Sequence, residues 1–201
     1  MSILADPETL LHVWFGPPSR PPLETSKQWF TKNEAFDESL RSQFGETLEA
    51  GVRGELDAWK STPRGRLALI VLFDQISRNI FRGTSRSFAQ DPLALAQSLA
   101  SLANGEDRLL TAVERYFVLM PLMHAEDVAM QHQCIAKFEQ LAAENPEPED
   151  VHKLLINALD YARRHAVIVE RFGRFPHRNG ILGRESTAEE KEFLTQPGSS
   201  F

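Results

Sequence analysis

The sequence predicts an all-α protein, and three observations carry that prediction. Helix start signals recur, because Asp6, Thr62 and Asp91 each precede a proline and so place a good N-cap residue before the first helical position. Apolar residues repeat at helical spacing, most clearly over 151–169. Strand signals are almost lacking. Short connections between consecutive helices favour antiparallel helical hairpins, stacked as a compact bundle or a short solenoid.

The expected helices follow one another closely along the chain. The run LALIVLF at 67–73 could be a buried strand, but it lies in about twenty residues rich in Leu and Ala, a length that favours a helix. A capping box at 186–189 predicts the start of the last helix, and Gly105 and Gly173 are typical of helix ends. The expected helices span 7–15, 25–35, 37–50, 52–59, 63–81, 92–103, 107–143 with a break at Pro121, 149–172 and 187–195.

Length and composition narrow the class of protein. The 201 residues are 42% hydrophobic and 25% charged, which is typical of one globular domain over 1–201. The net charge of -6 argues against general binding to nucleic acid or to an anionic membrane. The opening MSILADPETL lacks the pattern of a signal peptide and no apolar run could span a bilayer, so we expect a cytoplasmic protein. The single Cys134 lies on an apolar stripe and is expected to be a buried, inert thiol.

Arginine dominates the basic residues and is concentrated in two segments. Of the 22 Lys and Arg residues 16 are arginine, and nine of these lie in 78–86 and 163–184. The planar guanidinium suits fixed pairing with carboxylate or phosphate, whereas lysine serves a solvated surface equally well. The two segments are therefore candidates for an anion-binding site.

Charged residues continue an apolar stripe on the expected helix 63–81. At about 100° per residue, Asp74, Arg78 and Arg82 follow the stripe that Leu67 begins, and Asn79 lies beside it. The first half of this helix is apolar on both sides, so we expect it to be central and its charges to be paired or to line a wet cavity. The alternative is a solvated i, i+4 ion pair at a helix end. We expect Asp74, Arg78, Asn79 and Arg82 to contribute to binding.

His124 and Asp127 share a face of the helix expected after Pro121. Three residues apart, they could form an acid/base pair in which the carboxylate fixes the tautomer of the imidazole. They could equally supply two metal ligands, or be a core-edge histidine bonded to a helix-start residue with no chemical role.

The loop FPHRNG at 175–180 presents His177, Arg178 and Asn179 between a proline and a glycine, just after Arg174. If it folds back over the inner helices, Arg174 and Arg178 would join Arg78 and Arg82 in an anion-binding corner, with histidines as titratable groups. His165 is the exception, because a lone histidine on an apolar stripe is more often structural. The expected corner thus draws on both arginine-rich segments.

Long blocks of the sequence resemble a known family. They are DQISRNIFRGTSRSFAQDPLAL, ERYFVLMPLMHAEDVAMQ and RFGRFPHRNGILGREST followed by EEKEFL, with VWFG, WF, FDESLRSQF and GELDAW upstream. Together they resemble the largely bacterial domain-of-unknown-function family 924. The resemblance implies an all-α fold similar to tetratricopeptide-repeat proteins and brings no established activity. Ser77 stands where the family pattern has proline, and a serine keeps that helix straighter.

The leading functional hypothesis is a pocket that binds a small anionic metabolite, a phosphate or a carboxylate. The arginines would clamp the anion, and His124 with Asp127 or His177 would move a proton. One alternative is a helical-repeat module that binds a peptide or a partner protein. The weakest is a metal hydrolase using His124, Asp127, His165 and His177, because no spaced metal motif such as HExxH is present. A purely structural polar network would instead lose stability when Arg78 or Arg178 is removed. The sequence does not identify a cofactor.

Overall fold

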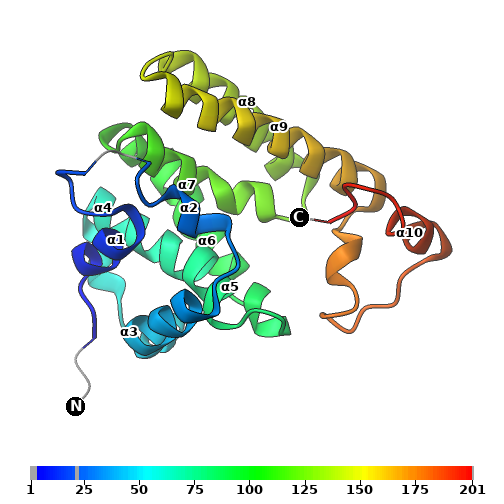
Figure 1. Ribbon diagram of the computed structural model, residues 1–201, viewed down its shortest axis with the longest axis horizontal. Coiled ribbons are helices and arrows are strands. Elements are labelled where there is room, and N and C mark those ends of the chain that lie inside the picture. The colour runs from blue at the N-terminus through cyan, green and yellow to red at the C-terminus, as the bar shows by residue number, and fades with distance from the viewer. Residues whose placement is uncertain (1–3, 21–22, 201) are drawn as a thin grey trace.

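The computed structural model describes residues 4–20 and 23–200, and the secondary structure in these ranges is helical (Figure 1). The expected all-α class is confirmed. The α-helices are α1 Pro7–Phe15, α2 Ser26–Phe30, α3 Glu34–Val52, α4 Pro63–Ile70, α5 Ser77–Ile80, α6 Asp91–Asn104, α7 Ala112–His124, α8 Val128–Glu144, α9 Glu149–Phe172 and α10 Ala188–Phe193. A π-helix, η2 Val71–Ile76, joins α4 to α5, and the 3-10 helices are η1 Asp57–Ser61, η3 Ser85–Phe88, η4 Glu106–Leu109 and η5 Pro176–Arg178.

Two of the three predicted proline-linked N-caps act as expected. The Asp6 carboxylate accepts a hydrogen bond from the amide of Thr9, and the Thr62 hydroxyl accepts one from the amide of Gly65. Asp91 differs, because it is the first residue of α6 and its carboxylate is used by arginines instead of by the helix end. The predicted capping box at 186–189 lies one residue later, between Thr187 and Glu190.

The observed bounds of some other helices differ from the predicted ones. Capping residues, and not Pro121, decide where α7 ends and α8 begins. Helix α7 runs through Pro121 and ends at His124, so the predicted break at Pro121 is wrong. The break lies at 125–127, where the Asp127 carboxylate accepts a hydrogen bond from the Met130 amide at the start of α8. The predicted helix 52–59 is replaced by a turn, in which Gly54 adopts φ +80, followed by η1.

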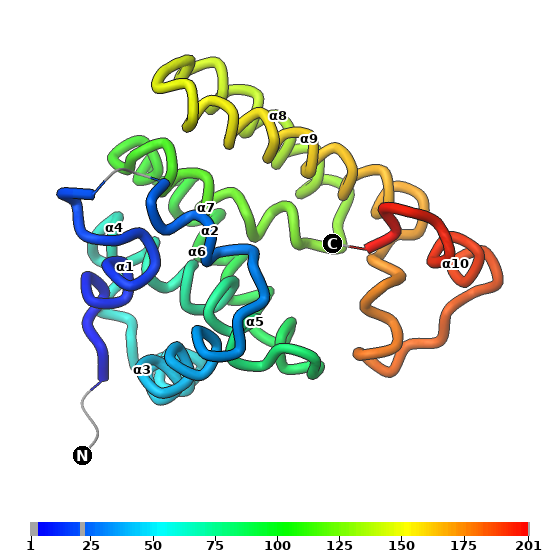
Figure 2. Tube along the Cα trace, viewed as in Figure 1, coloured from blue at the N-terminus to red at the C-terminus, as the bar shows by residue number. Residues whose placement is uncertain are grey.

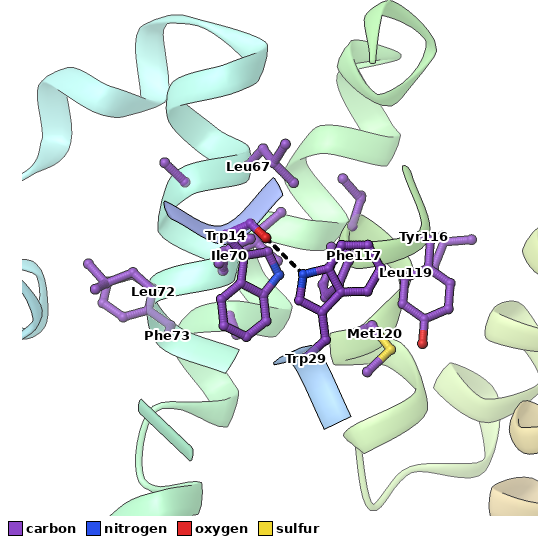
Figure 3. Close-up of a cluster of buried hydrophobic side chains, with 14 of the residues drawn as sticks. Trp14, Trp29, Leu67, Ile70, Leu72, Phe73, Tyr116, Phe117, Leu119 and Met120 are labelled. Carbon is purple, nitrogen blue, oxygen red and sulfur yellow. Dashed lines mark hydrogen bonds between the residues drawn. The ribbon is translucent and has the colours of Figure 1, made fainter. Parts of the chain in front are cut away.

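The stretch α4–η2–α5 is central, as its two apolar sides predict. Helix α4 packs against α1, α6 and α7, and α5 packs against α3. A large apolar core surrounds it (Figure 3), in which the ring of Phe117 meets Trp14 and Trp29 edge-on and Trp29 Nε1 donates to the carbonyl of Trp14 at 2.8 Å. Cys134 is fully buried in this core, and burial raises the pKa of its thiol, which confirms the predicted buried cysteine.

Helices α8 and α9 form a long antiparallel hairpin, which lies at the top of the view in Figure 1 and contributes side chains to the same core. The buried residues of α9 confirm the predicted apolar face. After α9 the chain turns back as a segment of mostly irregular backbone that carries η5 and α10 (Figure 2). None of the helices in the described ranges is long and apolar enough to cross a bilayer. The tetratricopeptide-like stacking stays a prediction.

Candidate functional site

Five charged or titratable side chains meet where the ends of several helices converge. We call them the central cluster: Asp74 from η2, Arg78 from α5, Asp91 from the start of α6, His124 from the end of α7 and Arg178 from η5. His124 Nδ1 lies 2.6 Å from Asp74 Oδ1, and Arg78 Nη2 lies 2.8 Å from Asp91 Oδ1 and 3.5 Å from Asp74 Oδ1. Arg178 Nη1 reaches the other oxygen of Asp91 at 3.2 Å. The cluster thus links segments that lie far apart in the sequence.

Asp74 is placed by the π-helix. All six residues of η2 are buried, and Asp74 is only 1% exposed. A π-helical turn is wider than an α-helical turn and is rare, and such turns occur frequently at functional sites. Burial acts to raise the pKa of Asp74, but its pairing with His124 and Arg78 and a hydrogen bond from Gln75 outweigh burial and hold that pKa well below its ordinary range. Asp74 is therefore a fixed negative charge.

His124 is oriented by Asp74. With Asp74 ionised, Nδ1 carries the proton and donates it in the hydrogen bond, which leaves Nε2 as the nitrogen with a lone pair. Burial lowers the pKa of His124, although Asp74 opposes the change. The side chain keeps 13% exposure. This arrangement of carboxylate and imidazole is the one that prepares a histidine to accept a proton at Nε2.

Arg78 and Arg178 bring two guanidinium groups to one carboxylate, Asp91. Arg178 also lies over the rings of Phe88 and Phe175, with its Cζ 4.7 and 4.5 Å from their centroids. Burial, together with the charge of Arg78, lowers the pKa of Arg178 to about 10. Burial also raises the pKa of Asp91. In the part of the chain that the structure describes, the buried Nε of each arginine has no hydrogen-bond acceptor.

Two further histidines lie around Phe175. The ring of His165, on α9, is 6.4 Å from the ring of His124 and 5.4 Å from that of Phe175, and the ring of His177 is 5.7 Å from that of Phe175. Burial lowers the pKa of His165 to about 3 and that of His177 to about 4. Both imidazoles are therefore neutral at physiological pH.

Asn79 and Arg82 lie in a different cluster. Both bind Asp37 of α3, with Arg82 Nε 2.7 Å from Oδ2 and Asn79 Nδ2 2.8 Å from Oδ1. The predicted stripe failed at Arg82 because α5 ends at Ile80, so helical spacing no longer applies two residues later. Asn79 and Arg82 thus tie α5 to α3.

Arg174 and Asn179 lie in a third cluster, around Glu190. Arg174 donates to both oxygens of Glu190, at 2.7 and 2.8 Å, and Asn179 donates to Ser186 Oγ at 3.0 Å and to Glu190 at 3.3 Å. These contacts hold the chain after α9 together. Of the four arginines expected to form one corner, only Arg78 and Arg178 meet, and His177 lies near them.

The contact between His124 and Asp127, on which the suggested acid/base pair depends, is not formed. Asp127 is exposed and its carboxylate caps α8, while His124 turns inward to Asp74. The predicted continuous helical face is interrupted by the break at 125–127, so a spacing of three no longer puts the two residues together.

Two important residues, Asp91 and Glu126, were missed by sequence reasoning. Asp91 has the pattern of an N-cap, and Glu126 that of a solvated residue. Glu126 Oε1 accepts from the Phe175 amide at 2.8 Å and from Arg184 Nη2 at 2.8 Å, and Oε2 accepts from Arg184 Nη1 at 2.5 Å. The run HAED, next to a predicted site histidine, was the signal that could have pointed to Glu126.

Two surface hollows lie away from the central cluster, in which the side chains of Arg78, Asp91 and His124 keep 20%, 18% and 13% exposure. One, of about 650 Å³, is on α9 around Asn157, and the other, of about 520 Å³, lies between α3 and the end of α5 around Arg41. Neither is lined by a member of the central cluster.

In residues 4–20 and 23–200 no group of three or more His, Cys, Asp or Glu side chains is arranged to hold a metal ion.

Acid is expected to release α10 from the Glu190 cluster. The hydrogen bonds from Arg174, with others from the Thr187 amide and Asn179, lower the pKa of Glu190 to about 2. A carboxylate with a lowered pKa stabilises the fold above its unfolded pKa of about 4.5, and that stabilisation is lost as the pH falls toward 2. The protection factors of the amides of 187–194, measured relative to the intrinsic exchange rate at each pH, should therefore fall across this window.

The control for this effect is Glu190→Gln, which keeps the shape of the side chain and removes its charge. At neutral pH the α10 amides of this variant should be less protected than those of the wild type, and their protection factors should change little on acidification. Equal protection in both proteins at neutral pH would contradict the role given to Glu190.

Fold and site together define the chain as a helical protein with a buried arginine, carboxylate and histidine cluster. The chain belongs to the family described as "Bacterial protein of unknown function (DUF924)", which it matches over residues 10–198, and this confirms the resemblance seen in the sequence. It is similar to a solved structure, the protein of unknown function ATU0120 from Agrobacterium tumefaciens, with 36% identity, a TM-score of 0.78 and coverage of 94% of this chain and 96% of that one. Among curated proteins none matches the sequence.

Proposed function

We propose that the central cluster binds a small anionic ligand, a phosphate or a carboxylate, and exchanges a proton with it through His124. One observation carries the proposal: two guanidinium groups, the buried Arg178 and the partly buried Arg78, share a single carboxylate beside an oriented histidine. Placing two like charges together in a buried site costs stability. Such a cost is typical of sites that are kept for binding or catalysis, where stability is given up for function.

Each cluster member has a distinct role in this proposal. Arg78 and Arg178 hold the anion by charge-assisted hydrogen bonds, to which their buried Nε–H groups contribute. His124 accepts or donates a proton at Nε2. Asp74 fixes the tautomer of His124 and stabilises its protonated form. Asp91 accepts a hydrogen bond from each guanidinium group and so fixes their positions relative to one another in the ligand-free protein.

Thermal shift measurements with a panel of phosphorylated metabolites, inorganic phosphate and small carboxylates test the proposal. One class of anion should raise the melting temperature of the wild type, because a ligand that binds only the native state stabilises it. Arg178→Met should abolish that rise, because it removes a guanidinium while keeping much of the side chain's bulk. At a ligand concentration about 100 times Kd the lost stabilisation is about 2.7 kcal/mol.

Arg82→Met is the matched control, because Arg82 forms an ion pair with Asp37 outside the central cluster. This variant should keep the full ligand-induced rise even if its own melting temperature changes. Two results would overturn the proposal: no anion stabilises the wild type, or Arg82→Met loses the effect as completely as Arg178→Met.

A further inference from the structure

We infer that the ligand of the central cluster is a small monocarboxylate, and that it binds together with one proton, which His124 accepts at Nε2. The inference rests on the proposed function, because it concerns the same site. It adds the chemical class of the ligand and the proton that accompanies it.

The charge balance of the cluster indicates that a bound anion is accompanied by a proton. Two carboxylates, Asp74 and Asp91, face two guanidinium groups, Arg78 and Arg178, so the formal charges cancel while His124 is neutral. An anion that enters this buried site adds an uncompensated negative charge, which is costly in a medium of low polarity. One added proton restores neutrality for a monoanion. A phosphate dianion would need two.

The geometry of the arginine pair indicates that the ligand is a carboxylate. The two guanidinium groups already bind a carboxylate, since Asp91 gives Oδ1 to Arg78 at 2.8 Å and Oδ2 to Arg178 at 3.2 Å. The spacing of the pair therefore suits a planar group with two oxygens. Asp74 and Arg178 are only 1% and 6% exposed, so little room is left for a bulky ligand.

The surroundings of His124 indicate that it is the group that accepts the proton. Asp74 contacts it directly, Arg78 and Asp91 act on it through their charges, and His165 faces it from α9. From the loop, Arg178 and His177 act on the neighbouring His165. The Asp74 carboxylate lies on Nδ1 of His124 and stabilises the imidazolium once Nε2 takes a proton from the solvent.

The pKa directions agree with this assignment. Burial lowers the pKa of His124, so the free site holds a neutral imidazole at pH 7. An anion bound at the arginines adds negative charge nearby and raises that pKa again. Affinity should consequently fall as the pH rises, by about tenfold per unit where one proton is taken up.

Titration calorimetry of the full chain with acetate, propionate, pyruvate and inorganic phosphate tests the inference. Each titration is run in two buffers of different ionisation enthalpy, so that the number of protons taken up follows from the difference in heat. The monocarboxylates should bind with an uptake of about one proton, and phosphate should bind at least about tenfold more weakly. Binding of phosphate without binding of the carboxylates overturns this inference and leaves the proposed function standing. Binding of none of the anions removes both.

Variants and a spectroscopic readout locate the proton. His124→Asn keeps a donor for Asp74 and removes the base, so carboxylate binding should weaken and proton uptake should fall to zero. In the wild type, ¹⁵N NMR should show the His124 imidazole becoming doubly protonated when acetate is added, a measurement that stands even if the variant folds poorly. Persistent uptake in His124→Asn, or an unchanged imidazole spectrum, overturns the inference.

Discussion

Replacing Asp91 by alanine is expected to lower the free energy of unfolding by about 3–5 kcal/mol, which corresponds to a loss of roughly 10 °C in Tm. Among the described residues, Asp91 is the carboxylate that pairs with both Arg78 and Arg178. Without it Arg178 loses its ion-pair partner, and Arg78 keeps only the longer contact of 3.5 Å with Asp74. A buried charge that loses its partner costs far more than the pair itself contributes.

Urea and thermal denaturation of a small set of variants check this result. Arg178→Met alone should stay within about 1 kcal/mol of the wild type, because burial and the charge of Arg78 disfavour the guanidinium. In the Asp91→Ala background, Arg178→Met should restore part of the lost stability. The double-mutant cycle of these two substitutions measures the interaction free energy between the two side chains. Glu139→Ala breaks the exposed pair with Arg163 and should cost about 1 kcal/mol or less. An Asp91→Ala loss no larger than that of this control would contradict the account.

Removing the Glu126 side chain is expected to release the segment after α9 and with it Arg178. Burial acts to raise the pKa of Glu126, but the hydrogen bonds from Arg184 and from the Phe175 amide outweigh it and lower that pKa. Charge-assisted hydrogen bonds contribute about 1.5–3 kcal/mol, so Glu126→Ala should lose about 2 kcal/mol locally. That loss corresponds to amide exchange about 30-fold faster over 175–184.

Hydrogen exchange followed by mass spectrometry reads this effect segment by segment. Protection of α4 and α7 should change much less than that of 175–184, because the large apolar core does not depend on Glu126. Glu189→Ala is the control, since Glu189 forms an exposed pair with Arg171 in the same part of the chain. Equal effects of the two variants would show that Glu126 does not hold the segment.

The fold could be predicted further than the site. Helical periodicity and caps depend on neighbours a few residues away, so most helices were found close to their observed bounds. Errors arose where a local signal had more than one use. Pro121 was read as a break although α7 continues through it, and Asp91 was read as a cap although it serves two arginines. The single domain over 1–201 stays a prediction.

For the candidate site, the sequence predicted which types of charged residue take part but not which residues contact each other. The burial of Asp74 followed from the apolar faces around it, whereas the side chain of Arg78 keeps 20% exposure, and the approach of Arg178 was expected from the loop that carries it. Helical spacing suggested Asp127 as one partner for His124, whereas the observed partner, Asp74, lies 50 positions upstream. Helical spacing carries no information about such contacts.

The sequence by itself determined the helical class, the central position of α4–η2–α5 and the presence of buried charge on it, because these follow from the order of apolar and polar residues along one segment. Only the tertiary structure decided which charges meet. Arg78 and Arg178 come together because the chain after α9 turns back and Glu126 holds it there, while Arg82 and Arg174 bind carboxylates nearer to them. Pairing of buried charges is set by distances between segments, and these distances exist only once the helices have packed.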